Sequence, residues 1–143
     1  MINVFFEETE ILDVSPEFFV SWLGELCKIE GKELGELSII FCSDEYLLQM
    51  NIEHLQHDYY TDIITFDYCE GDVVLGDLFI SVDRVKENSE QLGEMFHVEL
   101  NRVVAHGVLH LLGYGDKTDE EALLMREKEL FALGLIVPRE TNE

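Results

Sequence analysis

The sequence predicts a single α+β domain over residues 1–143, in which a mixed sheet of about four short strands packs with about five helices. The chain has 143 residues and is 47% hydrophobic, which is enough to bury one core without disulfides. Segments with helical spacing of apolar residues alternate with short β-branched apolar runs. The sequence shows no repeat, linker or low-complexity block, so one layered domain is the simplest architecture.

The first strand and the first helix are expected near the N-terminus. Residues 1–6 alternate loosely between apolar and polar side chains, as a strand does. Ser15 followed by Pro16 predicts a helix start, with serine as the cap and proline in the first turn, and Gly31 is expected to end this helix. Its core-facing stripe comprises Phe18, Phe19, Trp22, Leu23, Leu26 and Ile29.

A second strand and a second helix follow. Residues 37–42 form a short, partly β-branched apolar run that indicates a buried strand. Ser43 or Asp44 can cap a helix that continues to about Ile52. The polar residues 53–61 are expected to form a loop.

A hairpin and a third helix occupy the middle of the chain. Residues 63–66 and 73–80 have the composition of strands, and the turn-rich residues 67–72 join them. Ser81 is expected to cap the third helix and Gly93 to separate it from the next periodic segment.

Two further helices complete the prediction, and the first of them is expected to be central. Residues 95–112 carry apolar side chains over a wide face, which predicts a helix that is mostly buried. Thr118–Glu121 is a capping box that opens the last helix, and Gly134 is expected to end it. The tail after Pro138 is expected to fray.

The net charge restricts the range of partners. Lys and Arg number 9 against 31 Asp and Glu, which gives −22. Such a field repels polyanions, so it disfavours broad binding to DNA, RNA or an anionic membrane, and nucleic-acid contact must be local or metal-assisted. We expect neither a signal peptide nor a membrane-spanning helix. The first residues lack the basic segment and long apolar core of a signal peptide, and no apolar run reaches the length needed to span a membrane. The widely spaced cysteines suit reduced, buried thiols in the cytoplasm: Cys27, Cys42 and Cys69.

The predicted central helix carries a candidate metal site. His106 and His110 are four residues apart, so their rings lie on one helix face and can converge on one ion. Gly113 can adopt positive φ and end the helix, which allows Asp116 to return to the same ion. Three ligands leave a position for water, and zinc is the first expectation, although iron, manganese or nickel also suit this set. The alternative is that both histidines are merely packed or hydrogen-bonded and that Asp116 caps the next helix.

Two neighbouring positions bear on the chemistry of this site. Arg102 lies one helical turn before His106, where a guanidinium can border the ion and hold a phosphate, or can pair with Glu99 instead. Gly107 occupies the position at which the metzincin motif HExxHxxGxxH has its general-base glutamate. A metalloprotease-like hydrolase is therefore a less favoured alternative.

Several stretches together resemble one known family. Residues 106–116 are similar to the signature HGxLHLxGYDH, and residues 61–66, which follow Asn51, are similar to TDVLSF. Residues 75–80 are similar to the strand LGDIxI. A spaced final helix is matched by Glu121, Met125 and Glu129. On these residues the chain resembles the YbeY family of bacterial metal-dependent endoribonucleases, which act in ribosomal RNA maturation.

The resemblance implies a nuclease. It implies hydrolysis of phosphodiester bonds in single-stranded ribosomal RNA. Together with the helix position of Arg102, it leads us to expect His106, His110 and Arg102 as the catalytic residues. It also implies that His106, His110 and Asp116 hold one divalent ion, zinc being expected. The expected partners are ribosomal RNA and the small ribosomal subunit or its assembly proteins. Binding to DNA or to a membrane is not expected. A catalytically weak or inactive metal-binding assembly factor is the main alternative.

Two departures from the family pattern lead to further expectations. The family's third metal histidine falls on Asp116, which can still ligate, and an arginine associated with activity falls on Leu55. His54 and His57 flank Leu55 and are expected to contact substrate, replacing the lost cation when protonated, so activity would fall as pH rises past about 6.5. The alternative is that both are surface histidines with no such role. Thr61, which opens the matched stretch, is the third expected substrate contact.

Overall fold

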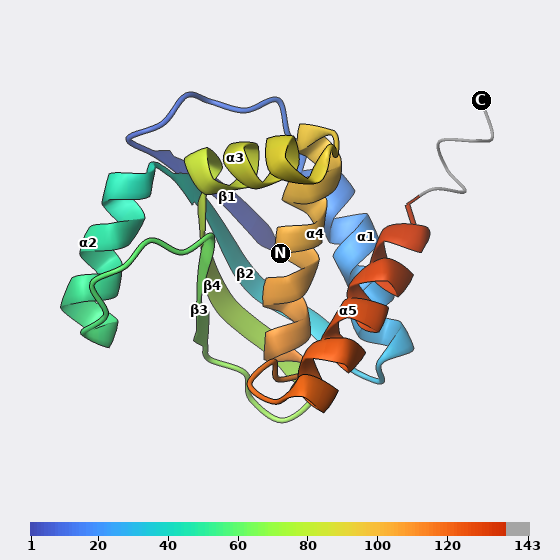
Figure 1. Ribbon diagram of the computed structural model, residues 1–143. Coiled ribbons are helices and arrows are strands. Elements are labelled where there is room, and N and C mark those ends of the chain that lie inside the picture. Colours follow the sequence, from blue (N-terminus) through green and yellow to red (C-terminus); the bar gives the residue numbers. More distant parts are fainter. Residues whose placement is uncertain (137–143) are drawn as a thin grey trace.

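The computed structural model describes residues 1–136 and contains one mixed sheet (Figure 1). The strands are β1 (Ile2–Glu7), β2 (Glu33–Cys42), β3 (Ile63–Asp67) and β4 (Val73–Ser81). Their order is β1-β2-β4-β3, with β1, β2 and β4 parallel and β3 antiparallel to β4. The β3–β4 hairpin and the α+β class are thereby confirmed.

Five helices accompany this sheet among the described residues. They are α1 (Pro16–Ile29), α2 (Asp44–Leu55), α3 (Val82–Leu92), α4 (Phe96–Leu111) and α5 (Asp119–Gly134). Four begin at the residues that the sequence predicts as caps, because a side-chain oxygen there accepts a backbone N–H of the first turn. These caps are Ser15, Ser43, Ser81 and Thr118.

The main core lies between one face of the sheet and the helices α1 and α4. Helix α1 covers β1 and β2, α4 covers β3 and β4, and α5 packs on α4 (Figure 1). Trp22 is buried in this core, and its indole N–H donates to the Ala132 carbonyl oxygen of α5 at 2.8 Å. Helix α4 is therefore enclosed by the sheet on one side and by α5 on another, which confirms that it is central.

A smaller apolar cluster lies where α2 packs on β3 and β4. Leu47 of α2 is buried there with Ile64 and Cys42, and Phe66 and Phe79 pack against them. Since successive strand residues point to opposite faces, Ile64 and Phe66 belong to this side of β3 while Ile63 faces α4.

Two element boundaries differ from the sequence prediction. Strand β2 begins at Glu33, four residues earlier than expected, because Glu33 and Leu34 pair with β4 across an irregularity in register. Helix α2 continues to Leu55 and ends where Gln56 adopts φ 58°. Pro138 lies outside the described residues.

Two of the three cysteines are buried, as expected. Cys27 and Cys42 are buried free thiols, and Cys69 is a half-buried one. Burial raises the pKa of Cys27 to about 11 and that of Cys42 to about 12, so both stay protonated at neutral pH. Among residues 1–136, no helix has the length and apolar character needed to cross a bilayer.

Candidate metal centre

Helix α4 holds the two histidines in place because the neighbouring face of the helix packs closely on the sheet. A Cβ added at Gly107 would lie 2.8 Å from Ile63 Cδ1 and 2.8 Å from Leu78 Cδ2, so α4 approaches β3 and β4 as closely as glycine allows. No larger side chain fits at position 107 without displacement of these two residues. His106 and His110 lie on the neighbouring face of α4 and are partly exposed.

The structure brings together the three predicted ligands. Asp116 Oδ2 lies 3.3 Å from His106 Nε2 and 3.5 Å from His110 Nε2. The two imidazole rings are nearly perpendicular, with centroids 4.6 Å apart, and one ligand atom from each residue lies within 4.8 Å of the others. Ligands about 2.0–2.1 Å from a tetrahedral ion are roughly 3.4 Å from one another, so both distances from Asp116 Oδ2 match those between ligands of a single zinc-sized ion.

The loop that carries Asp116 is held by the start of α5. Gly113 has φ 106°, the left-handed conformation that ends α4 and reverses the chain as the sequence predicts. Glu121 then accepts the backbone N–H groups of Lys117 at 3.0 Å and Thr118 at 3.3 Å, directly after Asp116. The capping box therefore orders the third ligand as well as the helix.

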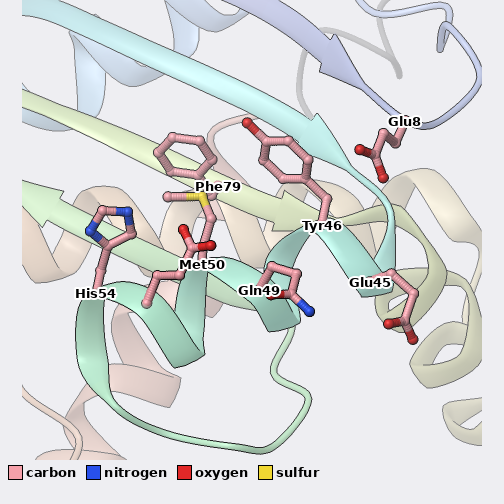
Figure 2. Close-up of a pocket in the computed structure, with 8 residues that line it drawn as sticks. Glu8, Glu45, Tyr46, Gln49, Met50, His54 and Phe79 are labelled. Carbon is pink, nitrogen blue, oxygen red and sulfur yellow. The ribbon is translucent and has the colours of Figure 1, made fainter.

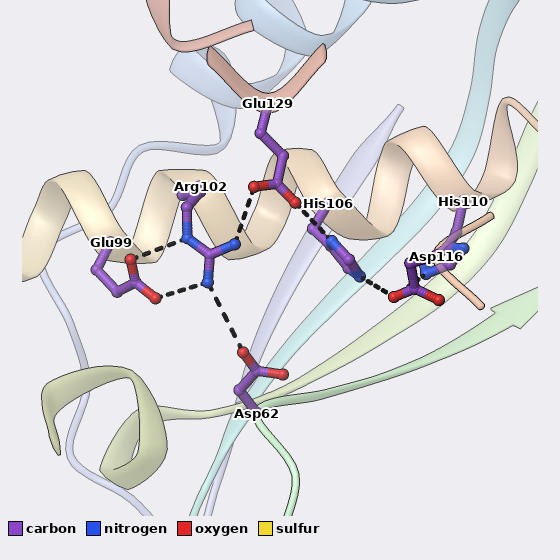
Figure 3. A network of polar contacts seen from close by, with 7 residues as sticks. All are labelled: Asp62, Glu99, Arg102, His106, His110, Asp116 and Glu129. Atoms are coloured by element: carbon purple, nitrogen blue, oxygen red, sulfur yellow. Dashed lines mark hydrogen bonds and ion pairs between the residues drawn. The ribbon is translucent and has the colours of Figure 1, made fainter. Parts of the chain in front are cut away.

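A buried glutamate of α5 contacts the Nδ1 atom of His106. Glu129 Oε2 lies 2.6 Å from His106 Nδ1, and Glu129 is only 3% exposed (Figure 3). Burial lowers the pKa of His106, but the hydrogen bond and charge of Glu129, with help from Asp116 and Asp62, outweigh burial and raise it. The pKa of Glu129 is lowered, since the contacts with His106 and Arg102 outweigh burial, which acts to raise it.

Arg102 is surrounded by carboxylates. Its guanidinium donates to both oxygens of Glu99, at 2.9 Å and 2.7 Å, and to Glu129 Oε1 at 3.0 Å. Asp62 approaches the same group at 3.9 Å, as Figure 3 shows. The hydrogen bonds to Glu99 contribute most to the raised pKa of Arg102. Burial raises the pKa of the Asp62 carboxyl. Of the two readings of Arg102, these contacts match pairing with Glu99; a contact with phosphate stays a prediction.

A cavity of about 380 Å³ opens beside His110. Leu55, Ile63 and Leu111 give it apolar walls, and Thr65 and Asp67 line it too. Leu55 is 42% exposed and reaches this cavity because α2 extends beyond the predicted end. A side chain at position 55 therefore borders the approach to His110.

The contacts found for the expected substrate-binding residues are with neighbours other than the three ligands. His54 lines a second cavity, of about 470 Å³, with Met50 and Phe79 (Figure 2). His57 stacks on Tyr59, with ring centroids 5.1 Å apart, and the Tyr59 hydroxyl lies 2.9 Å from His57 Nδ1. Thr61 is half-buried and immediately precedes Asp62. Their substrate roles stay predictions.

Sequence reasoning missed Glu129 and Asp62 as parts of this centre. Glu129 occupies a buried stripe of α5 with Met125 and Ala132. A glutamate within an apolar helical stripe was the available signal, because a buried carboxylate requires a partner. Asp62 lay within the stretch already matched to the family, but nothing in the sequence pairs it with Arg102.

The residues present fit a divalent cation. Asp62, Glu99, Glu129 and Asp116 together carry more negative charge than Arg102 offsets, which favours a cation at the three ligand atoms. Two imidazole nitrogens and one carboxylate oxygen suit zinc and also suit iron, manganese or nickel. Asp116 is 42% exposed at its side chain, so the site is accessible to water and to a substrate.

Comparison with known proteins gives one family. The family model described as Endoribonuclease YbeY matches residues 6–134. Proteins named Endoribonuclease YbeY from Phocaeicola vulgatus and Bacteroides thetaiotaomicron are each 48% identical to the chain. The matches cover 95% of the chain and 99% of the first relative, and 90% of the chain and 94% of the second.

A solved structure supports the same assignment at the level of the fold. The solution structure of TM1509 from Thermotoga maritima superposes with a TM-score of 0.71 at 27% identity. It covers 99% of this chain, and the match spans 93% of that protein. With the family model, the close relatives and the three converged ligands in agreement, the chain belongs to the YbeY family.

Proposed function

We propose that this protein is a metal-dependent endoribonuclease that hydrolyses phosphodiester bonds of single-stranded ribosomal RNA during ribosome maturation in the cytoplasm. His106, His110 and Asp116 hold one divalent ion, with zinc as the first choice. The observation that carries the proposal is the convergence of these three ligands in a chain of the YbeY family, whose matching model is described as an endoribonuclease.

Different parts of the protein position the three ligands and admit the substrate. A divalent ion held there supplies Lewis acidity at a phosphoryl oxygen and lowers the pKa of water. Helix α4 fixes the two imidazoles, and the ordered loop after Gly113 fixes Asp116. The cavity beside His110 gives an RNA strand access to the site. Because the chain carries −22, substrate contact depends on the ion and on partners more than on the surface field.

Cleavage of ribosomal RNA by protein purified without a histidine tag tests the proposal. We expect about one equivalent of a transition metal by elemental analysis, cleavage that stops with chelator, and recovery when zinc is restored. His110→Ala should abolish cleavage, whereas His97→Ala, which changes an exposed histidine of the same helix, should not. Failure to cleave RNA at any pH with any of the four metals would refute nuclease activity.

A second candidate is a metal-binding factor for small-subunit assembly without catalysis. The observation in its favour is the lack of lysine and arginine among the described residues lining the cavity beside His110. Arg102 is also engaged by carboxylates. This candidate predicts that wild type and His110→Ala bind small-subunit particles equally well and that neither cleaves RNA.

A further inference from the structure

We propose that Glu129 is a positioning residue for the metal site: its carboxylate accepts the Nδ1–H of His106 and so makes Nε2 the atom that faces the ion. This inference rests on the proposed metal-dependent function. It assigns a role to a residue of α5 that is neither a ligand nor a substrate contact.

The two nitrogens of His106 face different partners. Nδ1 lies 2.6 Å from Glu129 Oε2, and Nε2 lies 3.3 Å from Asp116 Oδ2. A neutral imidazole carries one proton, and only its other nitrogen can ligate a metal. A carboxylate only accepts hydrogen bonds when ionised, so Glu129 retains the proton on Nδ1 and leaves the Nε2 lone pair directed toward Asp116 and His110.

Glu129 is itself held in place. Its second oxygen accepts from Arg102 Nη1 at 3.0 Å, and Arg102 is itself fixed by the two hydrogen bonds that it donates to Glu99. Met125 and Ala132, one turn away on either side of Glu129, are buried and anchor this face of α5. A side chain constrained at both oxygens and at its backbone can fix the ring orientation of His106 as well as its tautomer.

Glutamine at position 129 shows why both oxygens matter. The amide keeps the size of the carboxylate but has one acceptor and one donor group. If its oxygen faces Arg102, its NH2 group faces His106 and favours the tautomer with the proton on Nε2, which blocks ligation by that atom. If its oxygen faces His106, its NH2 group meets the Arg102 guanidinium, donor against donor.

The test compares Glu129→Gln with Glu127→Gln, an exposed glutamate on the same helix. Metal affinity is measured by competition with a chelator for Zn²⁺, and ligand geometry by the visible spectrum of the Co²⁺-loaded protein. We expect Glu129→Gln to weaken Zn²⁺ binding roughly 10- to 100-fold and to alter the Co²⁺ spectrum, whereas Glu127→Gln changes neither. A purely structural role would alter thermal stability without altering the spectrum of the metal that remains bound.

A second measurement needs no variant and so does not depend on variant folding. Nitrogen-15 NMR of histidine-labelled, Zn²⁺-loaded wild type identifies the protonated and the metal-bound nitrogen of His106. We expect a protonated Nδ1 and a metal-bound Nε2; the reverse assignment overturns the proposal. Unchanged Zn²⁺ affinity in a folded Glu129→Gln protein overturns it as well. A wild type that binds none of the metals refutes the proposed function itself, so the two failures are distinguishable.

Discussion

Replacing Arg102 by leucine tests whether the buried charges beside the metal site form a structural unit. The side chain of Arg102 is 21% exposed, and its hydrogen-bond partners Glu99 and Glu129 are 2% and 3% exposed. Leucine removes the cation, so the buried Glu99 carboxylate loses its ion-pair partner and Glu129 keeps only its contact with His106 among these groups. A buried carboxylate without its partner is strongly unfavourable, because the desolvation already incurred is no longer offset.

The contacts give the size of the expected effect. Removing one partner of a buried ion pair costs about 3–5 kcal/mol, and Arg102 makes three hydrogen bonds of 2.7–3.0 Å to the two glutamates. We therefore expect Arg102→Leu to lower the free energy of unfolding by about 4 kcal/mol, which for a chain of this size lowers Tm by roughly 10 °C. The double variant Arg102→Leu/Glu99→Leu should be more stable than the sum of the two single changes predicts, since it removes a charge pair together.

Urea unfolding of the metal-free protein, monitored by circular dichroism in the presence of chelator, measures all four proteins of this cycle. Chelator is needed because bound metal adds its own stabilisation. A loss below about 1 kcal/mol for Arg102→Leu would refute the reasoning, since that is the range of an exposed ion pair. Strict additivity in the double variant would show that Arg102 and Glu99 are not coupled.

Three further predictions address the site directly. Asp116→Ala should weaken Zn²⁺ binding by more than the roughly 10- to 100-fold typical of a residue behind a ligand, and Asp116→His should retain binding; calorimetric titration with equal affinities for wild type and Asp116→Ala would contradict this. The pKa of His106 is raised above its ordinary 6.5, so in the metal-free protein its contact with Glu129 stabilises fully below pH 6.5 and is lost as pH rises through the higher folded pKa. The stability difference between wild type and His106→Gln should therefore shrink as pH rises above 6.5 in chelator, and a constant or growing difference would disprove it. Leu55→Arg should strengthen binding to single-stranded RNA and steepen its salt dependence by about 0.7 per phosphate contact, as measured by fluorescence anisotropy; an unchanged slope would show that position 55 does not meet the backbone.

The fold was predictable where local chemistry decides it. The four side-chain caps, the glycine turns and most of the helical stripe of α1 follow from spacing and from backbone preferences, and the elements appear in the predicted order. Ile29 was wrongly placed in that stripe: it is the last residue of α1 and is 51% exposed. The parallel pairing of β1, β2 and β4 was not predicted. Strand order depends on which faces pack across the core, and periodicity within one strand carries no information on its neighbours.

The candidate site was also predictable in part. The sequence by itself determined that His106 and His110 share a helix face and that Gly113 can return the chain toward Asp116, because these relations depend on helix geometry and on one backbone angle. Only the tertiary structure decided which side chains hydrogen-bond to His106 and surround Arg102. Glu129 follows His106 by 23 residues and contacts it because α5 packs on α4. The same packing places the buried Glu129 carboxylate against Arg102. Contacts between distant segments are set by how complete helices pack, and no local pattern encodes that.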